Sequence, residues 1–159
     1  MSSSTERVRA ALAEAGLSVQ IVETERSART AAEAAEAVGA QVGQIVKSLV
    51  FLCDGIAVMA LVSGANRLDE RKLAGAAEGR ITRADADAVR AATGFAIGGV
   101  APLGSTQPIR VFCDRDLLGF DVVWAAAGTP STVFAVPPAE LARAAGAMTA
   151  DLARRDVLD

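Results

Sequence analysis

The chain of 159 residues contains no histidine, and this absence excludes several kinds of catalytic site. Nucleophiles that depend on a histidine base, as in Ser-His-Asp and Cys-His pairs, cannot be built from this sequence. Histidine acid–base chemistry and zinc sites with histidine ligands are excluded in the same way. Any catalysis must therefore use carboxylates, lysine, hydroxyls, backbone groups or the substrate itself.

Cysteine is also scarce, with only Cys53 and Cys113 in the whole chain. Two cysteines make neither a disulfide framework nor a set of metal ligands. No activating neighbour is evident for either thiol, so we expect both to be reduced and packed as small hydrophobic side chains. We expect no metal ion and no cofactor.

Long apolar runs are missing as well. No stretch approaches the roughly 20 apolar residues that a membrane-spanning helix needs, and residues 1–16 have the pattern of an amphipathic helix rather than of a signal peptide. The hydrophobic content of 52% is typical of a globular protein. We therefore expect one domain, residues 1–159, in a cytoplasmic protein that has no membrane partner.

Lysine is rare compared with arginine: of 16 lysine and arginine residues, only Lys47 and Lys72 are lysines, and the net charge is −3. This charge argues against non-specific coating of DNA or RNA but leaves room for a local basic site. Lys47 lies inside the apolar stretch 44–53, QIVKSLVFLC, which predicts a strand. Its ammonium could extend from an edge strand to water. Alternatively, it could lie half-buried beside a pocket that binds phosphate or an oxyanion.

The order of predicted elements indicates an α+β fold with a mixed, largely antiparallel sheet, or a barrel-like sheet, surrounded by peripheral helices. Asp54-Gly55 between two apolar runs is a strong hairpin signal, because both residues of a type I′ turn need positive φ. We expect strands at 18–23, 45–52, 56–63, 108–113, 120–127 and 131–136. We expect helices near 3–16, 30–39, 69–77, 84–93 (capped by Thr82), 138–145 and 148–156.

The segment 94–104, GFAIGGVAPLG, holds four glycines and a proline, too many for the interior of a helix or a central strand. A proline-led strand follows it rather than a helix, so it is neither a dinucleotide-binding nor a P-loop motif. Two interpretations remain, a wide structural turn and a ligand site lined by backbone groups. We call this segment the glycine loop.

Together, KSLVF (47–51), TGFAIGGVAPLG (93–104) and a late strand ending in Ala127-Gly128 resemble the YbaK / prolyl-tRNA-synthetase-associated editing domain family. The similarity extends from the first helix to LARRD (152–156). The resemblance implies an aminoacyl-tRNA deacylase that acts in trans on mischarged tRNA, with Cys- or Ala-tRNA(Pro) as the expected substrate. It also implies the tRNA 3′ end as a partner, with a prolyl-tRNA synthetase as a second one.

Carried over residue by residue, the resemblance makes Lys47 the catalytic residue and Ser48 a substrate-binding neighbour. It also implies that Gly98, Gly99, Val100, Pro102 and Gly128 bind the substrate. Members of the family are thought to use water as the nucleophile with assistance from the substrate. Lys47 would then act by its charge and position, which agrees with a chain that lacks histidine.

Two departures from the family pattern bear on the substrate. Ala101 stands where serine often precedes the loop proline, and Ala126-Ala127-Gly128-Thr129-Pro130 stands where a Ser-Gly-Gly segment and a basic Lys-Arg-Gly are common. Ala101 and Ala126 favour a second hypothesis, a module that binds aminoacyl-adenosine, the tRNA end or a synthetase without turnover. A third, purely structural role would allow Lys47 to be replaced by methionine without loss of function.

Overall fold

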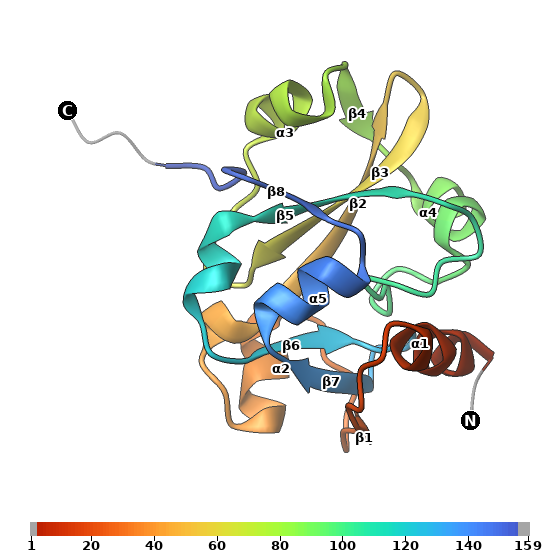
Figure 1. Ribbon diagram of the computed structural model, residues 1–159, viewed down its shortest axis with the longest axis vertical. Coiled ribbons are helices and arrows are strands. Elements are labelled where there is room, and N and C mark those ends of the chain that lie inside the picture. Colours follow the sequence, from red (N-terminus) through yellow and green to blue (C-terminus); the bar gives the residue numbers. More distant parts are fainter. Residues whose placement is uncertain (1–2, 156–159) are drawn as a thin grey trace.

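The computed structural model describes residues 3–155, which form two β-sheets with five α-helices around them (Figure 1). The larger sheet has the strand order β4 (Ile81–Arg83), β2 (Val46–Cys53), β3 (Ile56–Ser63), β5 (Arg110–Asp114), β8 (Met148–Ala150). Here β2 pairs antiparallel with β3 and β4, whereas the pairs β3–β5 and β5–β8 are parallel. The smaller sheet, β1 (Ile21–Glu23), β7 (Thr132–Val136), β6 (Val123–Ala126), is antiparallel throughout. The predicted α+β class with a mixed, largely antiparallel arrangement is confirmed.

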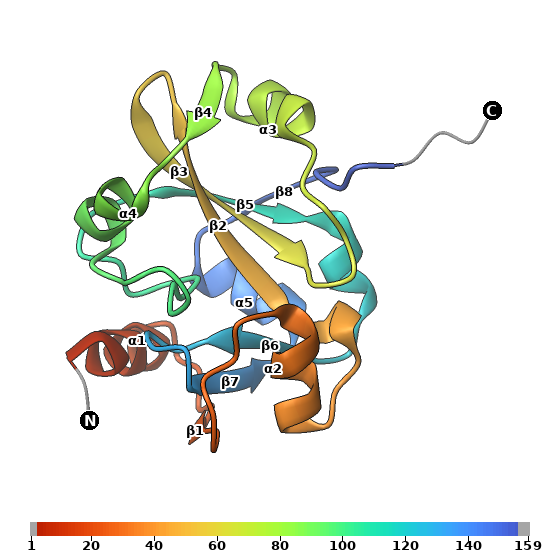
Figure 2. The same ribbon diagram turned by 180° about the vertical axis from the view of Figure 1, so that it is seen from behind.

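The α-helices are α1 (Ser3–Glu14), α2 (Ala31–Val38), α3 (Glu70–Ala77), α4 (Ala86–Thr93) and α5 (Pro138–Ala144). Two short 3₁₀ helices, η1 (Val42–Gln44) and η2 (Arg115–Gly119), precede β2 and follow β5. Figures 1 and 2, which view the molecule from opposite sides, show α5 in front in one and α2 in front in the other, so these two helices cover opposite sides. Within residues 3–155, no helix combines the length and apolar character that crossing a membrane requires.

The β2–β3 hairpin provides two adjacent, long strands of the larger sheet, and its turn forms as the sequence predicts. Asp54 and Gly55 have φ angles of 50° and 83°, which match the positive values that a type I′ turn needs. Alternate residues of both strands face opposite sides of the sheet. Met59 and Leu61 pack into one hydrophobic cluster, while Val58 and other even-numbered residues of β3 pack into a second. β3 is therefore buried on both faces.

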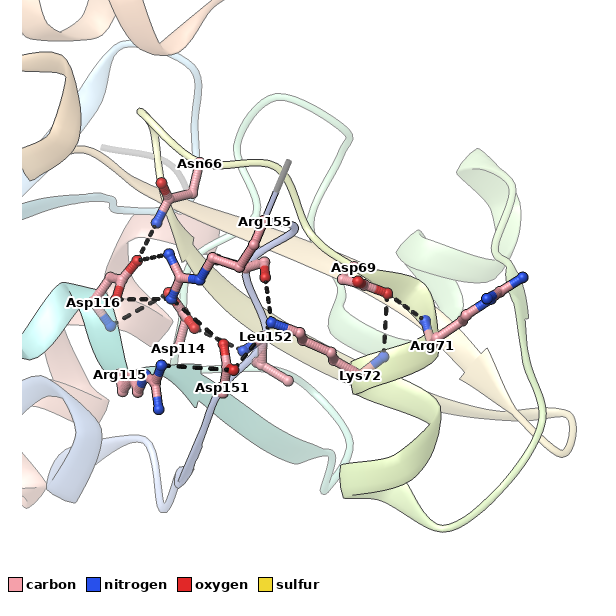
Figure 3. A network of polar contacts seen from close by, with 11 residues as sticks. Asn66, Asp69, Arg71, Lys72, Asp114, Arg115, Asp116, Asp151, Leu152 and Arg155 are labelled. Carbon is pink, nitrogen blue, oxygen red and sulfur yellow. Dashed lines mark hydrogen bonds and ion pairs between the residues drawn. The ribbon is translucent and has the colours of Figure 1, made fainter. Parts of the chain in front are cut away.

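The prediction of a helix over 148–156 is wrong for the part that the structure describes, residues 148–155. Met148–Ala150 form β8 beside β5, and the chain continues without a helix to the end of the described residues. The buried Asp114 carboxylate accepts the backbone N–H of Leu152 at 2.7 Å, and the Leu152 side chain is fully buried (Figure 3). Burial of Leu152 and pairing with β5 together outweigh the local helix propensity.

The predicted cap of the helix at 84–93 is also wrong. Thr82 lies in the short strand β4, paired with Leu52, and this strand was not predicted. Asp85 is the N-cap of α4, because its carboxylate accepts the Ala88 N–H at 2.8 Å. By contrast, Thr30 caps α2 as predicted, since its hydroxyl accepts the Glu33 N–H at 3.1 Å.

Candidate functional site

The site begins at an edge of β2 that no strand covers. β2 pairs with β3 along its whole length, but β4 reaches only residues Phe51 to Cys53 on the other side. At the beginning of the strand, one isolated bridge joins Ile45 to Trp124 of β6 and links the two sheets. Between these two points, residues 47–50 have no strand partner on this side within the described part of the chain. Side chains from both faces of β2 can therefore reach the same space.

A cavity of about 520 Å³ lies along this open edge, and we call it the β2 cavity. Its walls come from the start of α2, the glycine loop and the two strands β6 and β7 with the turn between them. The lining residues are Ala28–Ala31, Ala34, Val38, Ile45–Val50, Ala84, Val89, Ile97, Gly98, Val100, Trp124–Ala126, Thr129, Pro130 and Val133. Four segments far apart in the sequence thus meet at one space.

Lys47 lines the β2 cavity, and its side chain is half-buried. The ammonium donates a hydrogen bond to the backbone carbonyl of Asn66. No ion pair within residues 3–155 involves Lys47, so no carboxylate neutralises its charge. Burial lowers the pKa of Lys47 below its usual value, and the positive charge of Arg67 lowers it further. Lys47 is thus a cation without an ion-pair partner among the residues that line the cavity.

Ser48 contributes a polar group that has no partner in the protein. Its Oγ atom is buried, and it has no hydrogen-bond partner among the described residues. A buried hydroxyl without a partner is unfavourable by about 1–3 kcal/mol, so such groups in native proteins usually serve a ligand or a water molecule. Ser48 is among the residues that line the β2 cavity, so this unpartnered hydroxyl belongs to the cavity wall.

The glycine loop forms the opposite wall, where Gly98 and Val100 line the cavity. Gly99 lies between them but is buried against the β6–β7 turn. A Cβ atom on Gly99 would lie 2.7 Å from the Thr129 Cα and 2.9 Å from the Gly128 carbonyl oxygen, closer than any side chain allows. Glycine at this position therefore lets the loop approach the turn and sets the width of the cavity.

Two other predicted site residues do not line the β2 cavity. Gly128 is buried with φ of 103°, and its Cα lies against the backbone of Ser4 and Thr5 in α1. Pro102 is also buried and lines a separate cavity of about 470 Å³ between the glycine loop, α1 and α5. The structure thus brings together Lys47, Ser48, Gly98 and Val100 at the β2 cavity, whereas Gly99, Gly128 and Pro102 do not line it.

The departures from the family pattern fall in two different environments. Ala101 is fully buried in the hydrophobic core and is absent from the lining of the β2 cavity. Ala126 does line the cavity, at the end of β6. Serine is often found in the family at both positions. Only a serine hydroxyl at position 126 would therefore face a ligand in the β2 cavity.

Sequence reasoning missed several residues of the site. Arg29 lines the cavity directly before the cap of α2, and Trp124, the only tryptophan, lines it from β6. Asn66, whose carbonyl holds the Lys47 ammonium, is 19 residues further along the chain. The isolated tryptophan could have been noticed as a candidate, whereas no local pattern marks Arg29 or Asn66.

The charges and polar groups of the lining limit the chemistry that the cavity can perform. Lys47 and Arg29 are cationic, and among the described lining residues there is no carboxylate and no cysteine. Hydroxyls of Ser48 and Thr129 are present, and most of the remaining lining is apolar. Such a cavity can attract phosphate or a developing oxyanion and can hold a small apolar group, but it provides no side-chain carboxylate as a base.

Comparisons with known proteins agree with this arrangement. YwhH of Bacillus subtilis (strain 168), an uncharacterized protein, is 31% identical over 122 residues, which cover 76% of this chain and 78% of that protein. The proline–tRNA ligase of Nitratidesulfovibrio vulgaris (strain DP4) is 36% identical over 98 residues, which cover 61% of this chain and 17% of the ligase. The chain therefore matches only a small part of that larger enzyme.

Solved structures show the same fold over nearly the whole chain. The crystal structure of a candidate trans-editing enzyme for prolyl-tRNA synthetase superimposes with a TM-score of 0.91 and 49% sequence identity, covering 98% of this chain and 99% of that one. The profile of the aminoacyl-tRNA editing domain matches residues 25–144, a range that includes β2, the glycine loop and the β6–β7 turn. The chain belongs to the aminoacyl-tRNA editing domain family.

Proposed function

We propose that this protein is an aminoacyl-tRNA deacylase that acts in trans and hydrolyses the ester between a wrong amino acid and the tRNA 3′ end. The observation that carries the proposal is the β2 cavity, which combines the unpaired Lys47 ammonium and the unpartnered Ser48 hydroxyl with a lining that holds no carboxylate among the described residues. Membership of the editing domain family supports the same activity.

The chemistry of the lining favours water as the nucleophile. An aminoacyl ester is already activated, and the neighbouring ribose hydroxyl of the terminal adenosine can orient or deprotonate a water molecule. No carboxylate, cysteine or histidine lines the described part of the cavity to act as base or nucleophile. Lys47 would stabilise the negative charge that develops on the ester oxygen, an effect worth about 10²–10³ in rate for a single well-placed donor.

The substrate that we propose is tRNA(Pro) charged with cysteine or alanine. Apolar side chains such as Val50, Val89 and Val133 make up much of the cavity wall, which suits a small uncharged aminoacyl group. The relatives support proline tRNA, because one is a proline–tRNA ligase and another is a candidate trans-editing enzyme for prolyl-tRNA synthetase. With a net charge of −3, the chain gains little from non-specific attraction to RNA, so we propose that a prolyl-tRNA synthetase supplies part of the affinity.

A panel of charged tRNAs tests the activity. Ester release should be measured for Ala-, Cys- and Pro-tRNA(Pro), with wild-type protein and with Lys47→Ala. We expect the wild type to hydrolyse at least one of the two mischarged species while sparing Pro-tRNA(Pro), and we expect Lys47→Ala to lose most of that rate. Release no faster than the uncatalysed reaction on every species would refute the proposal.

One observation favours a second function, a module that binds the aminoacyl-adenosine end without hydrolysis. Ala126 lines the cavity at a position where family members often carry serine, so a hydroxyl is missing from the wall. A non-hydrolysable aminoacyl-adenosine analogue would then raise the melting temperature through binding to the folded state, while no charged tRNA would be hydrolysed. The variant Ala126→Ser distinguishes the two functions further, since it should create hydrolysis only if the missing hydroxyl is what prevents turnover.

A further inference from the structure

The contacts of the Lys47 ammonium lead to a group of residues outside the β2 cavity. Its acceptor, the Asn66 carbonyl, belongs to the loop 64–69 that joins β3 to α3. A carbonyl oxygen fixes the direction of an ammonium without removing its charge, as a carboxylate would. The position of this loop therefore decides where the positive charge of Lys47 lies.

The side chain of Asn66 is held in turn by an ion pair. Asn66 Nδ2 donates to Asp116 Oδ2 at 2.8 Å, and Arg155 binds both oxygens of the same carboxylate at 2.9 and 3.2 Å (Figure 3). Bidentate pairing of this kind is directional and fixes both partners. The hydrogen bond from Arg155 lowers the pKa of Asp116 the most, so the carboxylate stays charged and keeps accepting from Asn66.

The backbone of the same loop is tied to the segment 151–155. Arg154 N donates to Arg67 O at 2.8 Å, and Asp69 N donates to Leu152 O at 2.8 Å. Leu152 is anchored from the other side by the buried Asp114. The second half of the loop is therefore tied to the segment 151–155 at Arg67 and Asp69, directly after Asn66.

We propose that Asn66, Asp116 and Arg155 are positioning residues that hold the loop 64–69 so that its carbonyl directs the Lys47 ammonium within the β2 cavity. None of the three lines that cavity, so none touches the substrate there. The proposal rests on the deacylase function proposed above. It predicts that the contacts of Asn66, 19 residues after Lys47, with Asp116 and Arg155 control turnover rather than substrate affinity.

The test compares variants that remove the contact between Asn66 and Asp116 with one variant that removes a neighbouring contact. Asn66→Ala keeps the backbone carbonyl but removes the side-chain amide. Asp116→Ala removes the carboxylate that accepts a hydrogen bond from this amide. Asp116→Asn keeps one oxygen that can accept from Asn66 but loses the bidentate pair with Arg155, so it separates these two contacts. Lys72→Met is the matched control, because it removes two contacts with the same segment, those of Lys72 with Asp151 and the Ala153 carbonyl, but none of the contacts among Asn66, Asp116 and Arg155.

For the two alanine variants we expect kcat to fall by about tenfold or more, because a displacement of about 1 Å at a catalytic group can lower a rate by up to about 10². KM should stay within about twofold of the wild type, since the cavity wall is intact. Asp116→Asn should recover only part of kcat, because the pair with Arg155 is lost, and Lys72→Met should keep the wild-type value. Wild-type kcat in both alanine variants, or an equal loss in Lys72→Met, would overturn the proposal.

A second readout does not depend on enzymatic activity. The chain has only two lysines, so protein labelled with ¹³C at lysine Cε gives two side-chain NMR signals, and Lys72→Met assigns them. We expect the Lys47 signal to move in Asn66→Ala and Asp116→Ala and to move less in Asp116→Asn. An unmoved signal, or a moved signal with unchanged kcat, contradicts the proposal. If the wild type hydrolyses no ester, the proposed deacylase function is wrong. The NMR signals still decide whether Asn66, Asp116 and Arg155 position Lys47.

Discussion

Substitution of Gly99 by alanine tests the close contact that sets the width of the β2 cavity. The added Cβ would lie 2.7 Å from the Thr129 Cα, which is 0.7 Å short of the 3.4 Å at which ordinary contacts begin. Both neighbours at this point, Thr129 and Gly128, contribute backbone atoms, which cannot rotate away as a flexible side chain can. The glycine loop and the β6–β7 turn must therefore separate.

Separation of this kind is expected to destabilise the protein by about 1–3 kcal/mol, the usual range for an overpacked interior. For a chain of this size each 1 kcal/mol shifts the melting temperature by about 2–4 °C. Gly99→Ala should thus lower the melting temperature by about 2–12 °C. It should also lower deacylation, because Gly98 and Val100 on one side and Thr129 on the other all line the cavity.

The matched control is Gly75→Ala, the same chemical change in the middle of α3. A Cβ atom there meets nothing within 4 Å, and the residue is exposed. Replacing glycine by alanine inside a helix is favourable by about 1 kcal/mol, so the melting temperature should rise. Thermal unfolding followed by circular dichroism measures both variants. A Gly99→Ala protein as stable as the wild type would refute the reasoning from contact distances.

Three further predictions concern titratable groups. Burial raises the pKa of the Cys113 thiol to about 11. A thiol reagent at pH 8 should therefore leave Cys113 unmodified in the folded protein and label it in urea. Rapid labelling of Cys113 in the native protein would contradict this. The hydrogen bond from Arg155 depresses the pKa of Asp116, so the pair stabilises the folded protein at neutral pH and this contribution is lost as the pH falls below about 4. In Arg155→Met, the free energy of unfolding should therefore fall less steeply on the acid side than in the wild type. An unchanged pH dependence would refute the pairing. Burial disfavours the charged form of Lys47. Lys47→Met should therefore not lower the free energy of unfolding measured in urea at pH 7. A loss of more than about 1 kcal/mol would show that the ammonium has a structural role.

Local signals in the sequence were enough to predict much of the fold. Thr30 caps a helix and Asp54-Gly55 closes a hairpin because each depends only on residues within a few positions. The strand around Lys47 and the irregular backbone of the glycine loop were predicted for the same reason. For the site, Lys47 stood out as a lysine inside an apolar strand, whereas Ser48, Gly98 and Val100 were predicted from the family resemblance; all four line the β2 cavity.

Elements that depend on distant partners were mispredicted or missed. β8 is a strand because it pairs with β5, more than 30 residues earlier, and β4 exists because it pairs with the end of β2. Similarly, nothing near Asn66 in the sequence indicates that its carbonyl meets Lys47 or that Asp116 holds its amide. Such contacts arise from the tertiary fold, which overrides local propensity.

The most direct test of the proposed function is single-turnover hydrolysis of Ala-tRNA(Pro) and Cys-tRNA(Pro) with the protein in excess, because this separates the chemical step from binding and product release. We predict that the wild type accelerates ester loss for at least one of the two tRNAs. We also predict that Lys47→Met slows the chemical step by about 10²-fold, the usual effect of removing one group that stabilises an oxyanion. A wild-type rate equal to spontaneous hydrolysis, or a Lys47→Met protein as fast as the wild type, would contradict the assignment of the β2 cavity as a deacylase site.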